Sequence, residues 1–137
     1  MALKTISKLK KELDNIFSLF IRLRGANEFG LVQCFTCGCV KHYKKGMQNG
    51  HFQSRRFMST RFDEENCQIQ CVKCNLFEQG QQYQFGLQLD AKYGEGTADE
   101  LIFLAHKTVK FTRSDYDDKL SYYKSAVQNL KKEKGIE

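Results

Sequence analysis

The sequence predicts a mainly helical α+β fold, with amphipathic helices on either side of a short cysteine-rich core. Apolar residues recur at spacings of three and four at both ends of the chain, which is the period of an amphipathic helix. Residues 34–74 instead carry cysteines, glycines and short alternating runs, which are typical of turns and short strands. The 137 residues suffice for one hydrophobic core, so we expect a single domain, 1–137, with regions 1–33, 34–80 and 81–137.

The first helix is predicted over residues 5–24. Its apolar positions form one stripe: Ile6, Leu9, Leu13, Ile16, Phe17, Phe20 and Leu23. Gly25 is a natural end, because glycine commonly follows the last helical residue. Charged residues interrupt the apolar ones, so the segment lacks the continuous apolar stretch of a signal peptide or a membrane span. We therefore expect a soluble, cytoplasmic protein with no membrane partner.

The region after residue 80 predicts further helices. Tyr83, Leu87 and Ala91 share one face of a first segment, which Gly94 and Gly96 end. Two capping-box patterns then mark helix starts. The pairs are Thr97 with Glu100, for a short helix ending near His106, and Ser114 with Asp117, for the last helix.

The last helix has a seam of apolar residues spaced four, three, four and three apart. Its members are Tyr116, Leu120, Tyr123, Val127 and Leu130. The seam covers about two heptads, whereas a coiled coil usually needs three or four. Packing within the same domain is therefore favoured over dimerisation, although the apolar faces of the first and last helices could supply a dimer contact.

The charge is unevenly distributed along the chain. The net charge is +6, and residues 81–137 carry nine basic and nine acidic groups, so the whole excess lies before residue 81. A positive region suits a polyanion such as nucleic acid, whose phosphates attract lysine and arginine.

Two C-x-x-C pairs predict a zinc site. Cys34 and Cys37 are separated by 33 residues from Cys71 and Cys74, and four thiolates complete a tetrahedral zinc shell. In a cytoplasmic chain such pairs indicate a metal more often than a disulfide. Buried or redox-active cysteines are the alternative. Cys39 and His42, in a C-x-C-x-x-H pattern, are less favoured alternative ligands, and Cys67 is expected to be a buried thiol.

His51 and Asn66 lie between these pairs, and a second asparagine follows the last cysteine. Gly50-His51-Phe52 comes first, Asn66 stands five residues before Cys71, and Asn75 follows Cys74 directly. This order resembles the HNH nuclease motif with its last histidine replaced by asparagine. The segments CFTCG, NGHFQSR and RFDEENCQIQCVKCN, the later Tyr83 and the helical tail resemble the phage lambda NinG (Rap) recombination family. The cysteine pairs and Asn75 are also similar to those of phage endonuclease VII.

The resemblance implies a ββα-metal (HNH, or His-Me finger) core within residues 34–80. A hairpin would present His51, zinc would staple the cysteine pairs, and a helix would begin near Asn75. His51 would be the general base of phosphodiester hydrolysis, since a neutral imidazole accepts a proton at working pH. Asn66 would hydrogen-bond the backbone around the histidine loop. Taken alone, His51 reads as a structural histidine and Asn66 as a turn residue.

The resemblance also implies a catalytic Mg²⁺ or Mn²⁺ ion. Asn75 would be one ligand, because an amide oxygen suits a hard cation, although Asn75 also reads as a helix N-cap. Many HNH enzymes carry an aspartate ligand where this chain has Gly50. Glu78, one helical turn after Asn75, is expected to face the same ion, and His106 is an alternative ligand or a plain helix-end histidine.

Together these features predict a metal-dependent, structure-specific DNA endonuclease of phage recombination, acting in the bacterial cytoplasm. It would cut branched DNA such as a Holliday junction or D-loop, and a two-fold dimer would suit two-strand cleavage. The residues expected to contact DNA phosphates are Lys44, Lys45, Arg55, Arg56 and Arg61, which otherwise read as ordinary solvated charges. Two alternatives are a less selective HNH nicking enzyme and a non-catalytic zinc-ribbon DNA-binding protein.

Overall fold

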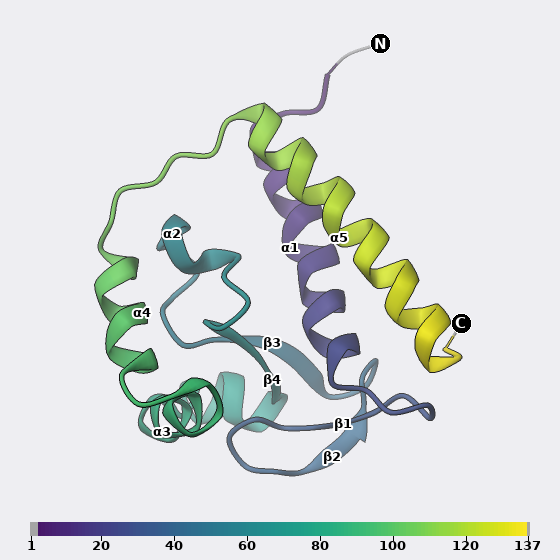
Figure 1. The fold of residues 1–137 in the computed structure, drawn as a ribbon, viewed down its shortest axis with the longest axis vertical. Helices are drawn as coiled ribbons and strands as arrows, with labels where there is room; N and C mark the ends of the chain where they lie inside the picture. Colours follow the sequence, from purple (N-terminus) through teal and green to yellow (C-terminus); the bar gives the residue numbers. More distant parts are fainter. Residues whose placement is uncertain (1–2, 137) are drawn as a thin grey trace.

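The computed structural model describes residues 3–136, and its architecture is a mainly helical α+β fold (Figure 1). Two long helices, α1 (Ile6–Arg24) and α5 (Arg113–Lys134), run side by side. Two small antiparallel hairpins lie beneath α1, and α3 (Gln82–Tyr93) and α4 (Thr97–Ala105) lie on the opposite side of the molecule from α5. The predicted combination of flanking helices with short central strands is confirmed.

The long helices are held together by their apolar faces. The predicted first helix is confirmed: Thr5 caps it by accepting a hydrogen bond from the Lys8 amide, and it ends before Gly25. The capping box of α5 lies two residues earlier than predicted, because Thr112 and Asp115 form it instead of Ser114 and Asp117. One shared core contains Leu9, Leu13, Phe17, Ile21, Tyr116, Leu120 and Tyr123. The last helix therefore packs within its own chain, and these faces are already covered.

The central hairpins position the cysteines and His51. The first pairs β1 (Leu31–Gln33) with β2 (Val40–His42), and the second pairs β3 (Met47–His51) with β4 (Cys67–Cys71). The loop from β3 to β4 contains α2 (Met58–Arg61), and β4 leads into η1 (Lys73–Phe77), a single π-helical turn. The second hairpin and this turn follow the strand–strand–helix order, with a much shorter helix than the resemblance implied.

The α3 helix buries a different face from the one predicted. Phe85 and Leu89 are fully buried against Phe52 and Leu101, whereas Tyr83 is 81% exposed. Apolar residues occupy every second position of this helix, so the sequence offers two stripes of i, i+4 spacing and the predicted one was wrong. In α4, Gly96 is the cap residue, and the Thr97 hydroxyl donates to the Gly94 carbonyl instead of capping the helix.

Among residues 3–136, no helix is both long enough and apolar enough to cross a bilayer.

Candidate functional site

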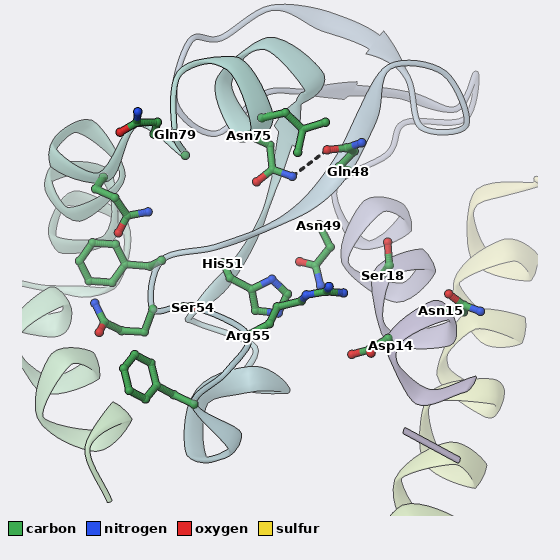
Figure 2. A pocket seen from close by; sticks show the side chains of 16 residues that line it. Asp14, Asn15, Ser18, Gln48, Asn49, His51, Ser54, Arg55, Asn75 and Gln79 are labelled. Carbon is green, nitrogen blue, oxygen red and sulfur yellow. Dashed lines mark hydrogen bonds between the residues drawn. The ribbon is translucent and has the colours of Figure 1, made fainter. Parts of the chain in front are cut away.

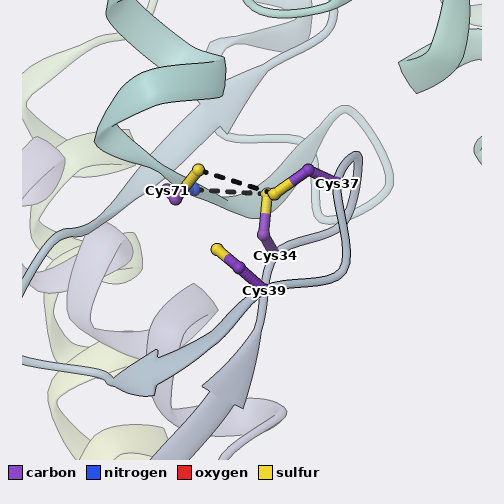
Figure 3. Close-up of side chains that lie close together, drawn as sticks. All are labelled: Cys34, Cys37, Cys39 and Cys71. Atoms are coloured by element: carbon purple, nitrogen blue, oxygen red, sulfur yellow. Dashed lines mark hydrogen bonds between the residues drawn. The ribbon is translucent and has the colours of Figure 1, made fainter.

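Four cysteine sulfurs gather between the two hairpins (Figure 3). The Sγ atoms of Cys34, Cys37, Cys39 and Cys71 all lie within 4.8 Å of one another. The Cys37 and Cys71 sulfurs are 3.7 Å apart, and sulfurs placed at Zn–S bonds of about 2.3 Å in a tetrahedron would be about 3.8 Å apart. The cluster therefore fits a structural zinc ion.

The identity of the fourth sulfur differs from the sequence prediction. Cys39 belongs to the cluster of four, whereas Cys74 does not. Cys74 lies next to the cluster, buried, with its amide donating to the Cys71 sulfur at 3.5 Å. The β1–β2 turn explains the difference, because the Cys34 amide bonds the Cys39 carbonyl and so brings Cys39 back beside Cys34. His42 is not in the group: its ring stacks on Tyr43 and accepts from the Lys44 amide.

The thiols of the cluster differ: burial raises the pKa of Cys39 to about 12, whereas hydrogen bonds outweigh burial at Cys34 and Cys71 and lower their pKa values. Burial tends to raise the pKa of Cys34, but the Cys37 amide and the Thr36 hydroxyl outweigh it and lower this pKa to about 6. Cys67 stands apart as the predicted buried thiol: it is fully enclosed, and its Sγ donates to the Arg61 carbonyl. Burial raises the pKa of Cys67, so this thiol stays protonated.

A polar pocket of about 780 Å³ lies between β3, α1 and the η1 turn (Figure 2). Asp14, Asn15 and Ser18 form its α1 wall. Among the described residues that line it, Asp14 is the one carboxylate. The other walls come from β3 and the loop after it, and from η1 and the turn that follows. They include Gln48, Asn49, His51, Arg55, Asn75 and Gln79.

His51, the last residue of β3, faces this pocket (Figure 2). Its Nε2 lies 3.0 Å from the Arg61 carbonyl oxygen. A carbonyl only accepts, so Nε2 must carry the hydrogen, and the lone pair of the neutral ring is on Nδ1. Burial lowers the pKa of His51 to about 4, against the opposing effect of this hydrogen bond. The imidazole is therefore neutral at pH 7 and has a free acceptor nitrogen.

Asn66 is fully buried and organises the loop after His51. Its Oδ1 accepts from the Gln53 amide at 2.8 Å, and its Nδ2 donates to the Gln53 and Thr60 carbonyls at 3.1 and 3.0 Å. Its own carbonyl accepts from the Phe52 amide. These bonds fix the two residues that follow His51, which is a structural contact of the kind expected for the middle asparagine.

Asn75 lies inside η1 and also lines the pocket. Its Nδ2 donates to Gln48 Oε1 at 2.7 Å, which leaves its Oδ1 pointing away from Gln48 (Figure 2). The N-cap alternative is wrong, because Val72 and Gln81 hold the cap positions of η1 and α3. The pocket contains a second amide acceptor, since Asn49 Oδ1 is buried with no hydrogen-bond partner.

Two expected metal ligands are not brought to Asn75. Glu78 follows the end of η1, is exposed, and is not part of the pocket wall, because the turn is too short to place it above Asn75. His106 ends α4, is exposed, and meets the Phe57 ring edge-on. It is also absent from the pocket wall.

Gly50 has no room for the aspartate found at this position in many HNH enzymes. A Cβ atom at residue 50 would lie 2.0 Å from Gln70 Oε1 and 2.6 Å from Gln70 Cδ. The buried Gln70 side chain therefore occupies the space that an acid at position 50 would need.

The five basic residues predicted to contact DNA differ in how free their side chains are to bind a phosphate. Arg55 lines the pocket, and Arg56 stacks on the Phe57 ring with its guanidinium 4.7 Å from the ring centre. Lys44 and Lys45 are exposed in the β2–β3 turn, outside the pocket wall. Arg61 is instead bound to Asp14 and has a side chain only 14% exposed, so it is not a free phosphate contact.

Sequence reasoning missed the α1 wall and part of the β3 wall. Asn49 could have been found, because it lies two residues before His51 and a strand places such residues on the same face. No local pattern marks Asp14, Asn15 or Ser18, since their role depends on how α1 packs beside β3.

Comparison with known proteins agrees with the motif order. The family model described as "Bacteriophage Lambda NinG protein" matches residues 1–133. The protein ninG of Salmonella phage P22 is 26% identical over 96% of this chain and 62% of its own length. The protein ninG of Escherichia phage 933W is 28% identical over 74% of this chain and 48% of its own length.

The curated relatives are longer than this chain. The chain spans between about half and two thirds of the length of the curated relatives that it matches. No solved structure matches it. Because the family model covers nearly all of its residues, the chain belongs to the bacteriophage lambda NinG family.

Proposed function

We propose that this protein is a metal-dependent DNA endonuclease of phage recombination that cuts branched DNA. The observation that carries the proposal is the state of His51. It is a neutral imidazole at the wall of a polar pocket, with Nε2 engaged by a carbonyl and Nδ1 left as an acceptor. A general base requires such a nitrogen next to a space that substrate and water can enter.

The protein's own groups have distinct parts in phosphodiester hydrolysis. Nδ1 of His51 takes a proton from water, the resulting hydroxide oxygen forms a bond to phosphorus, and the bond from phosphorus to the leaving oxygen breaks. The Arg61 carbonyl and Asn66 hold the imidazole and its loop in place meanwhile. Arg55, in the pocket wall, would bind a phosphate oxygen next to the scissile bond.

Two metal ions complete the proposal. Zinc on the four-cysteine cluster would hold the two hairpins together. Mg²⁺ or Mn²⁺ would be held at the Asn75 Oδ1, which is turned away from Gln48, with water filling most of the remaining positions. A divalent ion there would stabilise the charge that develops on the phosphate and on the leaving oxygen.

The substrate class rests on family and charge. The chain belongs to a phage family, its net charge is +6, and its basic excess lies before residue 81, in the part that forms the pocket. Phosphate contacts of this kind position a DNA duplex without reading its sequence. The proposed preference for branched over linear DNA comes from the resemblance to a recombination family, since phosphate contacts alone would act on both forms.

The test compares cleavage of labelled Holliday junction, D-loop and linear duplex in the presence of Mg²⁺ or Mn²⁺. His51→Ala should lower the cleavage rate by roughly a hundredfold or more, the usual contribution of a general base. His106→Ala is the matched control, because this histidine lies outside the pocket wall, and it should cleave like wild type.

Three outcomes would overturn parts of the proposal. Equal cleavage by His51→Ala and wild type would remove His51 as the base. Equal rates on junction and linear DNA would favour the less selective nicking enzyme. Binding without cleavage of any substrate would favour the non-catalytic DNA-binding protein.

A further inference from the structure

An ion pair at the edge of the pocket links Asp14 of α1 to Arg61 in the loop after β3. Arg61 Nε lies 3.0 Å from Asp14 Oδ1, and Arg61 Nη2 lies 2.5 Å from Asp14 Oδ2. The side chains are 14% and 19% exposed, so solvent screens this two-point pair less than an ordinary surface pair. Asp14 lines the same pocket as His51 (Figure 2), and the Arg61 carbonyl is the hydrogen-bond partner of His51, so the pair is connected to the candidate base.

Arg61 connects the α1 wall of the pocket to His51. Its Nη1 donates to the Arg55 carbonyl at 2.8 Å, so its side chain ties the loop to α1. Its own carbonyl accepts from His51 Nε2 at 3.0 Å. The atom that sets the ring orientation of His51 therefore belongs to the residue that Asp14 holds.

The local helix cannot supply this placement on its own. Arg61 ends α2, which has four residues, and so short a helix is not stable without tertiary contacts. In contrast, α1 is a 19-residue helix packed along α5. Asp14 therefore connects a weak element to a rigid one.

We propose that Asp14 is a positioning residue for His51 that acts through Arg61. The carboxylate fixes the Arg61 guanidinium, the fixed Arg61 presents its carbonyl to Nε2, and the Nδ1 lone pair is thereby directed into the pocket. The kinetic part of this inference rests on the proposed endonuclease function, whereas its structural part does not.

The structural part is tested by nitrogen-15 NMR of the imidazole rings, with the His51 signals identified from His51→Ala. In wild type, His51 should show one neutral tautomer, with hydrogen on Nε2. Asp14→Asn keeps the shape of the side chain but removes its charge, and it should give a mixture of tautomers. Glu12→Gln is the matched control, because it removes an acid of the same helix that pairs with Lys4 at the surface. It should leave the His51 signals unchanged.

The kinetic part is tested on the cleavage reaction. Asp14→Asn should lower kcat about tenfold or more, because a slightly misplaced base is costly. KM should stay the same or fall, since losing a negative charge does not weaken DNA binding. Asp14→Glu, which can still pair with Arg61, should recover most of kcat. If a variant were merely misfolded, its thermal stability would fall and a smaller fraction of the protein would be active. A positioning role instead lowers the kcat of the folded protein.

The outcomes separate this inference from the proposed function. A folded Asp14→Asn variant with the wild-type tautomer and the kcat of Glu12→Gln would overturn the inference. If Asp14→Asn does not fold, Arg61→Gln replaces it, because glutamine cannot form an ion pair with Asp14, and an unchanged His51 tautomer there would also overturn the inference. A tautomer change in a protein that cleaves no DNA would support the positioning contact and contradict the endonuclease.

Discussion

At the scale of single residues, the space beside His51 is controlled by Gln70. Its Nε2 donates to Thr36 Oγ1 at 3.1 Å and to the Gly80 carbonyl at 2.8 Å. One buried amide thus connects the cysteine loop to the rim of the pocket. A side chain at residue 50 would overlap the same amide, so glycine is the residue that fits here without a shift of Gln70.

This arrangement predicts that Gly50→Ala destabilises the protein by about 1–3 kcal/mol, the usual cost of overpacking. Chemical denaturation measures the effect. Gly25→Ala is the matched control, because nothing lies within 4 Å of a Cβ there, and it should unfold close to wild type. Replacing Gln70 by alanine as well should remove part of the Gly50→Ala penalty. A Gly50→Ala variant as stable as Gly25→Ala would show that Gln70 moves aside freely.

At the scale of elements, the β1–β2 turn decides which cysteines meet. Cys34, Cys37 and Cys39 lie on this one turn and share the cluster with Cys71, at the end of β4. Zinc bound there would link the two hairpins across a long stretch of sequence. Cys74 is the neighbouring fifth thiol.

We therefore expect purified protein to hold about one zinc ion per chain, and Cys39→Ser to weaken its binding more than Cys74→Ser does. Metal analysis after competition with a chelator measures both. Cys67→Ala is the control, since this thiol is buried against Arg61, away from the cluster, and it should retain zinc. Zinc loss in Cys74→Ser with retention in Cys39→Ser would restore the two C-x-x-C pairs as the ligand set.

The long helices could be predicted from sequence because their signals are local. The stripe of Leu9, Leu13 and Phe17 and the stop at Gly25 specify α1 without knowledge of its partner. The seam from Tyr116 to Val127 does the same for α5. The error at the start of α5 arose because two overlapping residue pairs fit one capping pattern, and only the backbone path selects Thr112.

The remaining parts depend on tertiary packing. The sequence of α3 offers two equivalent stripes, and contact with Phe52 and Leu101 selects the one containing Phe85 and Leu89. The single turn of η1 leaves Glu78 exposed outside the pocket wall, which spacing alone does not reveal. The positions of His51, Asn66 and Asn75 could be recognised because one family motif spans all three. Asp14 belongs to no such motif, so no pattern in the sequence marks it.

At the scale of the whole molecule, the pocket unites segments that are far apart in sequence. Its walls run from Asp14 in α1 to Gln82 at the start of α3. The basic excess lies in this part of the chain, while residues 81–137 are balanced. The proposed DNA path therefore follows the pocket and not the α4–α5 side.

A binding experiment in the His51→Ala background tests this path without cleavage. Arg55→Gln should weaken DNA binding at all salt concentrations and reduce the slope of log affinity against log salt by about one, as loss of one phosphate contact does. Lys45→Gln, at the exposed β2–β3 turn, is the comparison and should have a smaller effect. A loss of affinity in Lys45→Gln with none in Arg55→Gln would move the DNA path to that turn.

The bridge formed by Gln70 also limits how this protein can change by mutation. A chain that acquired aspartate at position 50 would first meet Gln70 at an impossible distance. A chain that first shortened Gln70 would lose the bonds to Thr36 and Gly80. Each single step is harmful although the two together could be tolerated, because residues in contact do not act independently. The glycine before His51 is therefore expected to be inherited together with Gln70 as a linked pair.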